Sequence, residues 1–229
     1  MLRARLLQLT IKTEHLLMHL TNQRLLPTLQ HTSDELTKQF DLIDTERKET
    51  LLRLAHYVRE RLATGKQVYL NFICTHNSRR SHISQLWAQA AAHAYGIENV
   101  HCLSGGTEVT AFNPRAVKAM QHVGFQILVN QPGDNSVYQV RFAEDAPPVI
   151  AFSKRYDDPF NTTTEFVAIM TCSHADANCP MVLGATQRMS VTYNDPKEYD
   201  GTEREEEKYL ERVAQIGREM LFAFSMMKD

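Results

Sequence analysis

The sequence predicts an α/β fold, with a mostly parallel sheet, helices on both of its faces and an N-terminal helical extension. From residue 67 onward, short apolar runs alternate with segments of helical periodicity, which is the order of a parallel sheet with crossover helices. Before residue 65, the apolar residues recur at helical spacings only. We therefore expect residues 1–65 to form the extension and 66–229 to form the main domain, with an insertion near 130–165.

The strands are predicted from short, bounded apolar runs, and the helices from apolar residues spaced three and four apart. The predicted strands are 67–74, 99–106, 147–153 and 165–172, and 137–142 alternates in polarity and could pair with 147–153 in an inserted hairpin. The predicted helices of the main domain are 81–96, 113–125 and a closing helix over 209–224.

Three helices are predicted in the N-terminal extension. The first covers 2–20, the second begins in 32–40 with Thr32 or Ser33 as its cap, and the third follows the Asp44-Thr45 pair and stops at Gly65. These helices could act as a lid or as an arm for a homodimer. The alternative, which we favour, is that they pack on the main domain or on each other.

Composition excludes several classes of protein. The chain has 229 residues, 43% of them apolar and 23% charged, with a formal net charge of -2. This balance gives no argument for nucleic acid or a membrane surface as the main partner. No apolar run approaches the ~18–20 residues that span a bilayer, and Arg3, Arg5 and Lys12 interrupt the first segment, so it lacks a signal-peptide core. We expect a cytoplasmic protein.

A reactive loop is predicted where the first strand ends. Cys74 and Arg80 are separated by five residues, between a predicted strand and a predicted helix. In that setting successive backbone N–H groups can converge on a tetrahedral oxyanion, and an arginine can clamp two of its oxygens. The same positive field favours the thiolate of Cys74 as a nucleophile. A buried core thiol and solvated arginines are the alternatives.

The stretch "CTHNSRRS" resembles the loop of low-molecular-weight protein tyrosine phosphatases and of the thioredoxin-coupled arsenate reductases that share their fold. Their pattern is Cys-x-Gly-Asn-x-Cys-Arg-Ser, and the stretch 104–125 resembles the family's second strand, loop and helix. The matching residues are Cys74, Asn77, Arg80 and Ser81, and the remaining loop residues are Thr75, His76, Ser78 and Arg79. His76 replaces the usual glycine and Arg79 the usual second cysteine. The resemblance implies that Asn77 shapes the loop and that Ser81 supports the thiolate.

A second pair of cysteines, Cys172 and Cys179, directly follows a predicted strand. They could be inert thiols, or zinc ligands together with His174 and Asp176, although structural zinc sites favour closer cysteine spacings and a second ligand pair. "CSHADANCP" closely resembles the signature of the arsenate reductases of this fold. That resemblance implies a disulfide relay, in which Cys74 attacks arsenate, Cys172 attacks Cys74, and Cys179 attacks Cys172 before thioredoxin reduces the pair.

The leaving oxygen needs a proton donor. The family that this chain resembles supplies it from an Asp-Pro pair before the last helix, so we expect the same here. Asp195 has that position, and Asp158 is a competitor. The reductases of this fold often bind potassium through an acid in the helix after the loop. The corresponding residue here is Gln85, so we expect no metal and no bound cofactor. Cys102, inside the second strand, is expected to be a core residue.

The leading interpretation is an arsenate reductase that takes electrons from thioredoxin. The alternative is a phosphatase of phosphotyrosine or a small phosphoester, in which the second cysteine pair protects Cys74 and Tyr193 and Tyr199 hold the substrate ring. The third interpretation is a redox-sensing or anion-binding module without catalytic activity. The expected partners are an arsenate or phosphate-like oxyanion and thioredoxin, with neither nucleic acid nor membrane, and with a possible homodimer through the N-terminal helices.

Overall fold

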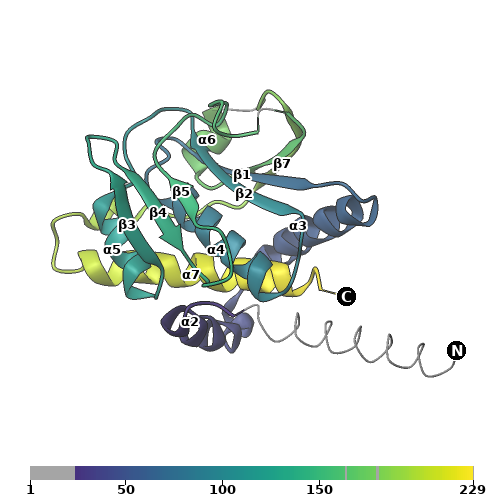
Figure 1. Cartoon of the computed structure of the whole chain (residues 1–229), viewed down its shortest axis with the longest axis horizontal. Helices are drawn as coiled ribbons and strands as arrows, with labels where there is room; N and C mark the ends of the chain where they lie inside the picture. Colours follow the sequence, from purple (N-terminus) through teal and green to yellow (C-terminus); the bar gives the residue numbers. More distant parts are fainter. Residues whose placement is uncertain (1–23, 163, 179–180, 229) are drawn as a thin grey trace, which may run out of the picture.

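The fold is built on a four-stranded parallel sheet, as the sequence predicts. The computed structural model describes residues 24–162, 164–178 and 181–228. Within these ranges the sheet has the order β2-β1-β6-β7 (Figure 1). Its strands are β2 (Val100–Gly106), β1 (Val68–Cys74), β6 (Phe166–Met170) and β7 (Ala185–Ser190), and each neighbouring pair is parallel. Strand β7 was not predicted, because only partly buried and exposed residues form it.

The two faces of this sheet are covered differently. Side chains of alternate residues point to opposite faces of a strand, so Leu70 and Phe72 of β1 enter the large core, whereas Ile73 joins a smaller cluster on the other face with Cys172. The large core is closed by α4 (Arg80–Ala94), α5 (Pro114–His122) and α7 (Glu205–Ser225). The smaller cluster is covered by the short helix α6 (Ser173–Asn178).

The described N-terminal helices pack on the C-terminal helix of the same chain. Helix α2 (Pro27–Thr37) and α3 (Thr45–Ala63) both contact α7, which runs between α2 and the sheets in Figure 1. The cap predicted for α3 is present, since the Asp44 carboxylate accepts the Arg47 N–H at 2.8 Å. The cap predicted for α2 is wrong. That helix begins at Pro27, which is favourable at a first helical position, so Thr32 and Ser33 lie inside it. The helix expected over 2–20 lies outside the described residues.

A second, antiparallel sheet falls largely within the expected insertion. It has the order β3-β4-β5, formed by β3 (Gln126–Gln131), β4 (Val137–Arg141) and β5 (Val149–Ala151). The predicted hairpin partners β4 and β5 do pair, with Gln139 opposite Ile150. Strand β3 was missed, since only one of its six residues is buried.

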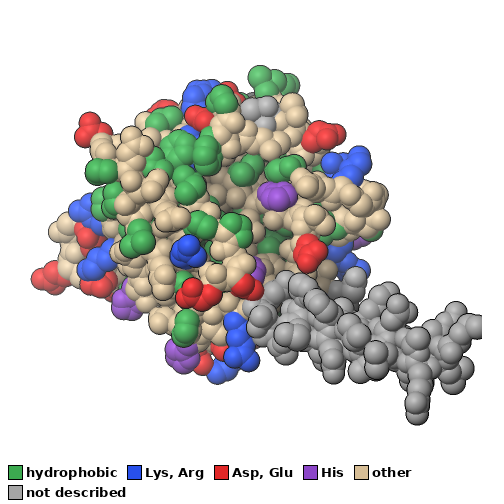
Figure 2. All heavy atoms as spheres, viewed as in Figure 1, with side chains coloured by type: hydrophobic (Ala, Val, Ile, Leu, Met, Phe, Trp, Pro, Cys, Tyr) green, Lys and Arg blue, Asp and Glu red, His purple; other side chains and the backbone are tan. Residues whose placement is uncertain are grey.

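On the face shown in Figure 2, basic and acidic side chains are interspersed and do not gather into a patch of one sign. Among the described residues, no helix has both the length and the apolar character needed to cross a bilayer.

Candidate active site

The predicted loop and Cys172, the first cysteine of the second pair, meet at one edge of the parallel sheet. Cys74 is the last residue of β1, and Cys172 follows the end of β6, the strand beside it. Since parallel strands share their carboxyl ends, both sulfur atoms are delivered to the edge where ligands bind in such sheets. Both thiols are buried. The sequence places each of them at the end of a predicted strand but does not show that these two strands are neighbours.

The loop of residues 74–81 is held by the two side chains that the family pattern singles out. The Cys74 Sγ lies 3.1 Å from the Ser81 Oγ, and the Asn77 Nδ2 donates to that same oxygen at 2.9 Å. Asn77 has a φ of 43°, in the left-handed region that asparagine tolerates better than most residues. His76 is not among the residues with positive φ, so the usual glycine is not needed there for the backbone.

The segment after β5 supports the loop from behind. The backbone N–H of Lys154 donates to the Asn77 Oδ1 at 2.9 Å, and the Ser153 hydroxyl donates to the His76 carbonyl at 2.9 Å. The same segment also passes close to β2 at residue 105. Glycine is required there, because a Cβ would lie 2.2 Å from the Tyr156 Cα. Sequence reasoning missed this support, since the insertion resembles no part of the family pattern.

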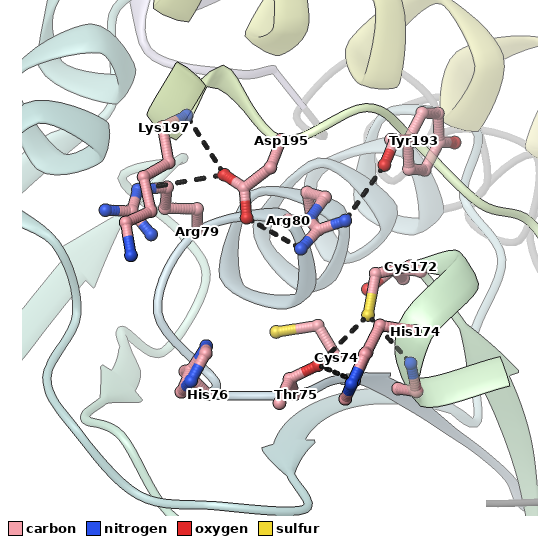
Figure 3. Close-up of polar contacts among 12 residues, drawn as sticks. Cys74, Thr75, His76, Arg79, Arg80, Cys172, His174, Tyr193, Asp195 and Lys197 are labelled. Carbon is pink, nitrogen blue, oxygen red and sulfur yellow. Dashed lines mark hydrogen bonds and ion pairs between the residues drawn. The ribbon is translucent and has the colours of Figure 1, made fainter. Parts of the chain in front are cut away.

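Arg80 links the loop to the candidate acid. Its guanidinium donates to the Asp195 Oδ2 at 2.7 Å and to the Tyr193 carbonyl at 3.0 Å (Figure 3). Asp195 also caps the short 3-10 helix η2 (Pro196–Tyr199) by accepting the backbone N–H of Lys197 at 3.1 Å. The competitor Asp158 instead accepts the Phe160 backbone N–H in a turn. Of the two Asp-Pro pairs, only that of Asp195 is placed against the loop arginine.

Arg79 is tied into the protein and is not a solvated surface charge. Its Nε donates to the Tyr209 hydroxyl at 2.8 Å, and its guanidinium lies 3.4 Å from the Asp200 carboxylate. The Tyr209 hydroxyl in turn donates to Asp200 at 2.7 Å, and burial raises the pKa of this tyrosine to about 12. The residue in place of the usual cysteine therefore connects the loop to α7.

A threonine hydroxyl connects Cys172 to a histidine. The Thr75 Oγ1 lies 3.5 Å from the Cys172 Sγ and 3.2 Å from the His174 Nδ1 (Figure 3). The backbone N–H of Ala175 also donates to the Cys172 sulfur at 3.3 Å. Cys172 has no exposed surface, whereas His174 is exposed. Sequence reasoning treated His174 only as a candidate zinc ligand, and no spacing in the sequence indicates its contact with Thr75.

The other candidate residues that the structure describes lie apart from this chemistry. Cys179 is outside the described residues, and Asp176 bonds to Arg188. Among the residues that the structure describes, no three His, Cys, Asp or Glu side chains are grouped as metal ligands. Gln85 donates to the Cys102 carbonyl at 3.0 Å. Cys102 lies in the core as expected, and burial raises the pKa of its thiol.

The two tyrosines expected to hold a phenyl ring do not line the site. Tyr193 is 5% exposed and its ring lies under the Arg47 guanidinium, 5.2 Å from the ring centroid. The ring of Tyr199 faces the cations of Arg204 and Lys208, each 5.6 Å from its centroid. The buried Tyr193 ring is therefore not available as a wall for an aromatic phosphoester, and the Tyr199 ring instead contacts these two cations.

Curated relatives identify the family. The chain is 30% identical over 148 residues to the arsenate reductase of Bacillus licheniformis, which covers 65% of this chain and 86% of that relative. The chain belongs to the arsenate reductase family. The arsenate reductase of Bacillus subtilis strain 168 is also 30% identical, over 62% of this chain and 84% of its own length. No protein-family model matches the chain.

This member of the arsenate reductase family is also similar, more distantly, to several solved structures. A thioredoxin-dependent arsenate reductase from Corynebacterium glutamicum is 18% identical with a TM-score of 0.35, over 82% of this chain and 92% of its own. A low-molecular-weight phosphotyrosine phosphatase from Vibrio cholerae O395 is 14% identical with a TM-score of 0.45, over 69% and 94%. The family assignment rests on the curated relatives.

Proposed function

We propose that this protein reduces arsenate to arsenite with electrons from thioredoxin, through a relay of Cys74, Cys172 and Cys179. The observation that carries the proposal is the convergence of Cys74 and Cys172 at one sheet edge, with Thr75 in contact with the Cys172 sulfur. A phosphatase has no step that uses Cys172, so the placement of a second thiol beside the loop favours the reductase.

The first step uses the loop. The Cys74 thiolate attacks arsenic, an As–O bond breaks, and Asp195 supplies the proton with which the oxygen leaves as water. Arg80 lies 2.7 Å from Asp195, so the guanidinium can bind the oxyanion while the carboxyl stays within reach of the leaving oxygen. The product is a thiol–arsenate adduct on Cys74.

The second step uses the buried thiol. The Cys172 thiolate attacks the Cys74 sulfur, the S–As bond breaks, and its electron pair stays on arsenic, which leaves as arsenite. The thiol first has to lose its proton within an apolar cluster. We propose that the proton passes to the Thr75 hydroxyl while the hydroxyl proton passes to the His174 Nδ1, since both contacts are in place.

The third step moves the disulfide outward. Cys179 attacks Cys172, Cys74 is released as a thiolate, and the dithiol of thioredoxin reduces the Cys172–Cys179 disulfide. Helix α6 occupies the residues between them. Seven residues of helix span about 10 Å, which is longer than the Cα–Cα distance of about 4.4–6.8 Å in a disulfide. We therefore expect α6 to unwind during the relay.

The test is arsenate-dependent NADPH oxidation in the presence of thioredoxin and thioredoxin reductase. Wild type is compared with Cys172→Ser and Cys179→Ser, and Cys102→Ser is the matched control for a cysteine outside the relay. We expect turnover in wild type and in the control, and loss of at least a hundredfold in both relay variants. Equal turnover in all four proteins would overturn the relay.

A further inference from the structure

A cavity beside the oxyanion loop is not used by the proposed relay. Its volume is about 300 Å³, and its lining includes His76, Ser78, Arg79, Thr110, Asn113 and Lys197. At about 30 Å³ for each water molecule, it holds roughly ten waters, which is far more room than a five-atom oxyanion needs. Cys172 is not among the residues that line it.

The lining is basic and lacks aromatic walls. His76 and Arg79, the two positions at which the loop departs from the family pattern, both line this cavity, together with Lys197. None of the described residues in the lining is acidic or a phenylalanine, tyrosine or tryptophan. A pocket for an anionic aliphatic group has this composition, whereas a pocket for a phenyl ring has apolar and aromatic walls.

Lys197 supplies the cation that other residues do not neutralise. Arg79 lies 3.4 Å from Asp200 and 3.9 Å from Asp195, and the His76 Nε2 lies 3.3 Å from Glu108. The Lys197 ammonium forms no ion pair with any described residue, and its side chain extends toward Arg79 in Figure 3. An anionic ligand in the cavity would therefore meet this charge first.

The cavity is positioned for the substituent of an ester. Lys197 follows Asp195 by two residues, and its backbone N–H bonds to the Asp195 carboxylate at 3.1 Å. An ester oxygen that receives a proton from Asp195 would therefore lie close to a residue that lines the cavity. The group attached to that oxygen would extend past His76 and Arg79 toward the Lys197 ammonium.

We propose a further activity at this site, the hydrolysis of small aliphatic phosphomonoesters that carry a second anionic group, held by Lys197. It rests on the loop chemistry of the proposed function. Cys74 attacks phosphorus, the P–O ester bond breaks, and the alcohol leaves with the Asp195 proton. Water then attacks the phosphocysteine, its proton returns to Asp195, and inorganic phosphate and the Cys74 thiolate are released.

The test compares two isosteric substrates, 2-carboxyethyl phosphate and its neutral amide, 2-carbamoylethyl phosphate. Release of inorganic phosphate by the full chain is measured for wild type, Lys197→Met, Lys197→Arg and the remote control Lys118→Met. We expect wild type to favour the carboxylate in kcat/KM by about five- to tenfold, the effect of one partly desolvated ion pair. Lys197→Arg and Lys118→Met should keep that preference, and Lys197→Met should abolish it.

Arsenate turnover of the same preparations separates this proposal from the reductase function. Equal kcat/KM for the two esters, a preference that survives in Lys197→Met, or no ester hydrolysis while arsenate is turned over would each overturn the proposed ester activity. Selective ester hydrolysis that depends on Lys197, without any arsenate turnover, would support the cavity assignment and overturn the reductase.

Discussion

Lys154 is a buried cation next to the oxyanion loop. Its side chain is 2% exposed, and its ammonium lies over the Phe152 and Phe160 rings, 4.6 and 5.4 Å from their centroids. Burial lowers its pKa from 10.5 to about 8, and the negative charge of Asp158 opposes that shift. Burying the charged ammonium therefore lowers the free energy of unfolding.

This cost predicts a pH-dependent stability. Below about pH 8 Lys154 is protonated in both the folded and the unfolded chain, so the full cost of burying its charge applies. Between about pH 8 and 10.5 the unfolded chain binds more protons than the folded one, and the free energy of unfolding rises with pH. Lys154→Met should therefore be more stable than wild type at pH 7. Removing the buried charge should gain up to about 3 kcal/mol in the free energy of unfolding, and the lost cation–π attraction should reduce this gain by ~1 kcal/mol.

Urea unfolding at pH 7 and pH 10 measures this difference, with Lys118→Met as the exposed control. The advantage of Lys154→Met should shrink at the higher pH. A difference that does not change with pH, or a less stable Lys154→Met at pH 7, would show that the buried charge is not the source of the effect.

His174 is expected to affect one step of the relay through Thr75. His174→Gln keeps a polar side chain but removes the base, so arsenite formation in a single turnover should slow by about ten- to a hundredfold at neutral pH. The deficit should narrow as pH rises, because hydroxide can then remove the proton that the histidine accepts at neutral pH. The control is His56→Gln on the exposed face of α3. A loss that is the same at every pH would indicate a structural role only.

Among the elements, α6 is the one that we expect to change shape in the proposed relay. Arg188 of β7 anchors it by donating to the Asp176 carbonyl at 2.6 Å and to the Asp176 carboxylate at 2.5 Å. These bonds hold the helical form in which Cys172 faces the loop. Since we expect the helix to open when the proposed Cys172–Cys179 disulfide forms, these bonds favour the reduced state.

Removing this anchor should lower the reduction potential of the Cys172–Cys179 pair. A half-exposed ion pair contributes about 1 kcal/mol, which corresponds to roughly 20 mV. Arg188→Met should shift the potential by this amount toward more negative values in a thiol–disulfide redox titration. Arg53→Met serves as control, because this arginine donates to the Thr50 hydroxyl of its own helix, α3. An unchanged or less negative potential would contradict the anchoring role.

The sequence predicted most elements whose apolar pattern is strong. The buried strands β1 and β6 and the amphipathic helix α7 follow from periodicity, because burial of one face or of a whole strand decides their position. Strands β3 and β7 were missed, since their residues are mostly exposed and pairing alone fixes them. The start of α2 was missed because Pro27, and not a polar side chain, begins it.

At the scale of the whole molecule, the parallel sheet explains why distant residues share one site. Its carboxyl edge brings together β1, β6 and the segment before α7. The sequence pattern predicted that Cys74 and Cys172 lie at strand ends, whereas Asp195 was expected near the loop from the family resemblance. What could not be predicted was the support from residues 152–156, the bond from Arg79 to Tyr209, and the contact of Thr75 with His174. Each joins segments separated by dozens of residues with no common pattern. The boundary near residue 65 stays a prediction.

The relay is tested most directly by identifying the disulfide that remains after one turnover of arsenate. The reduced protein is mixed with arsenate without thioredoxin, quenched with acid, and mapped by peptide mass spectrometry. Wild type should hold a Cys172–Cys179 disulfide with one equivalent of arsenite released, and Cys179→Ser should instead trap a Cys74–Cys172 disulfide. Release of arsenite with all three cysteines still reduced, or with Cys74 bound to Cys102, would contradict the account.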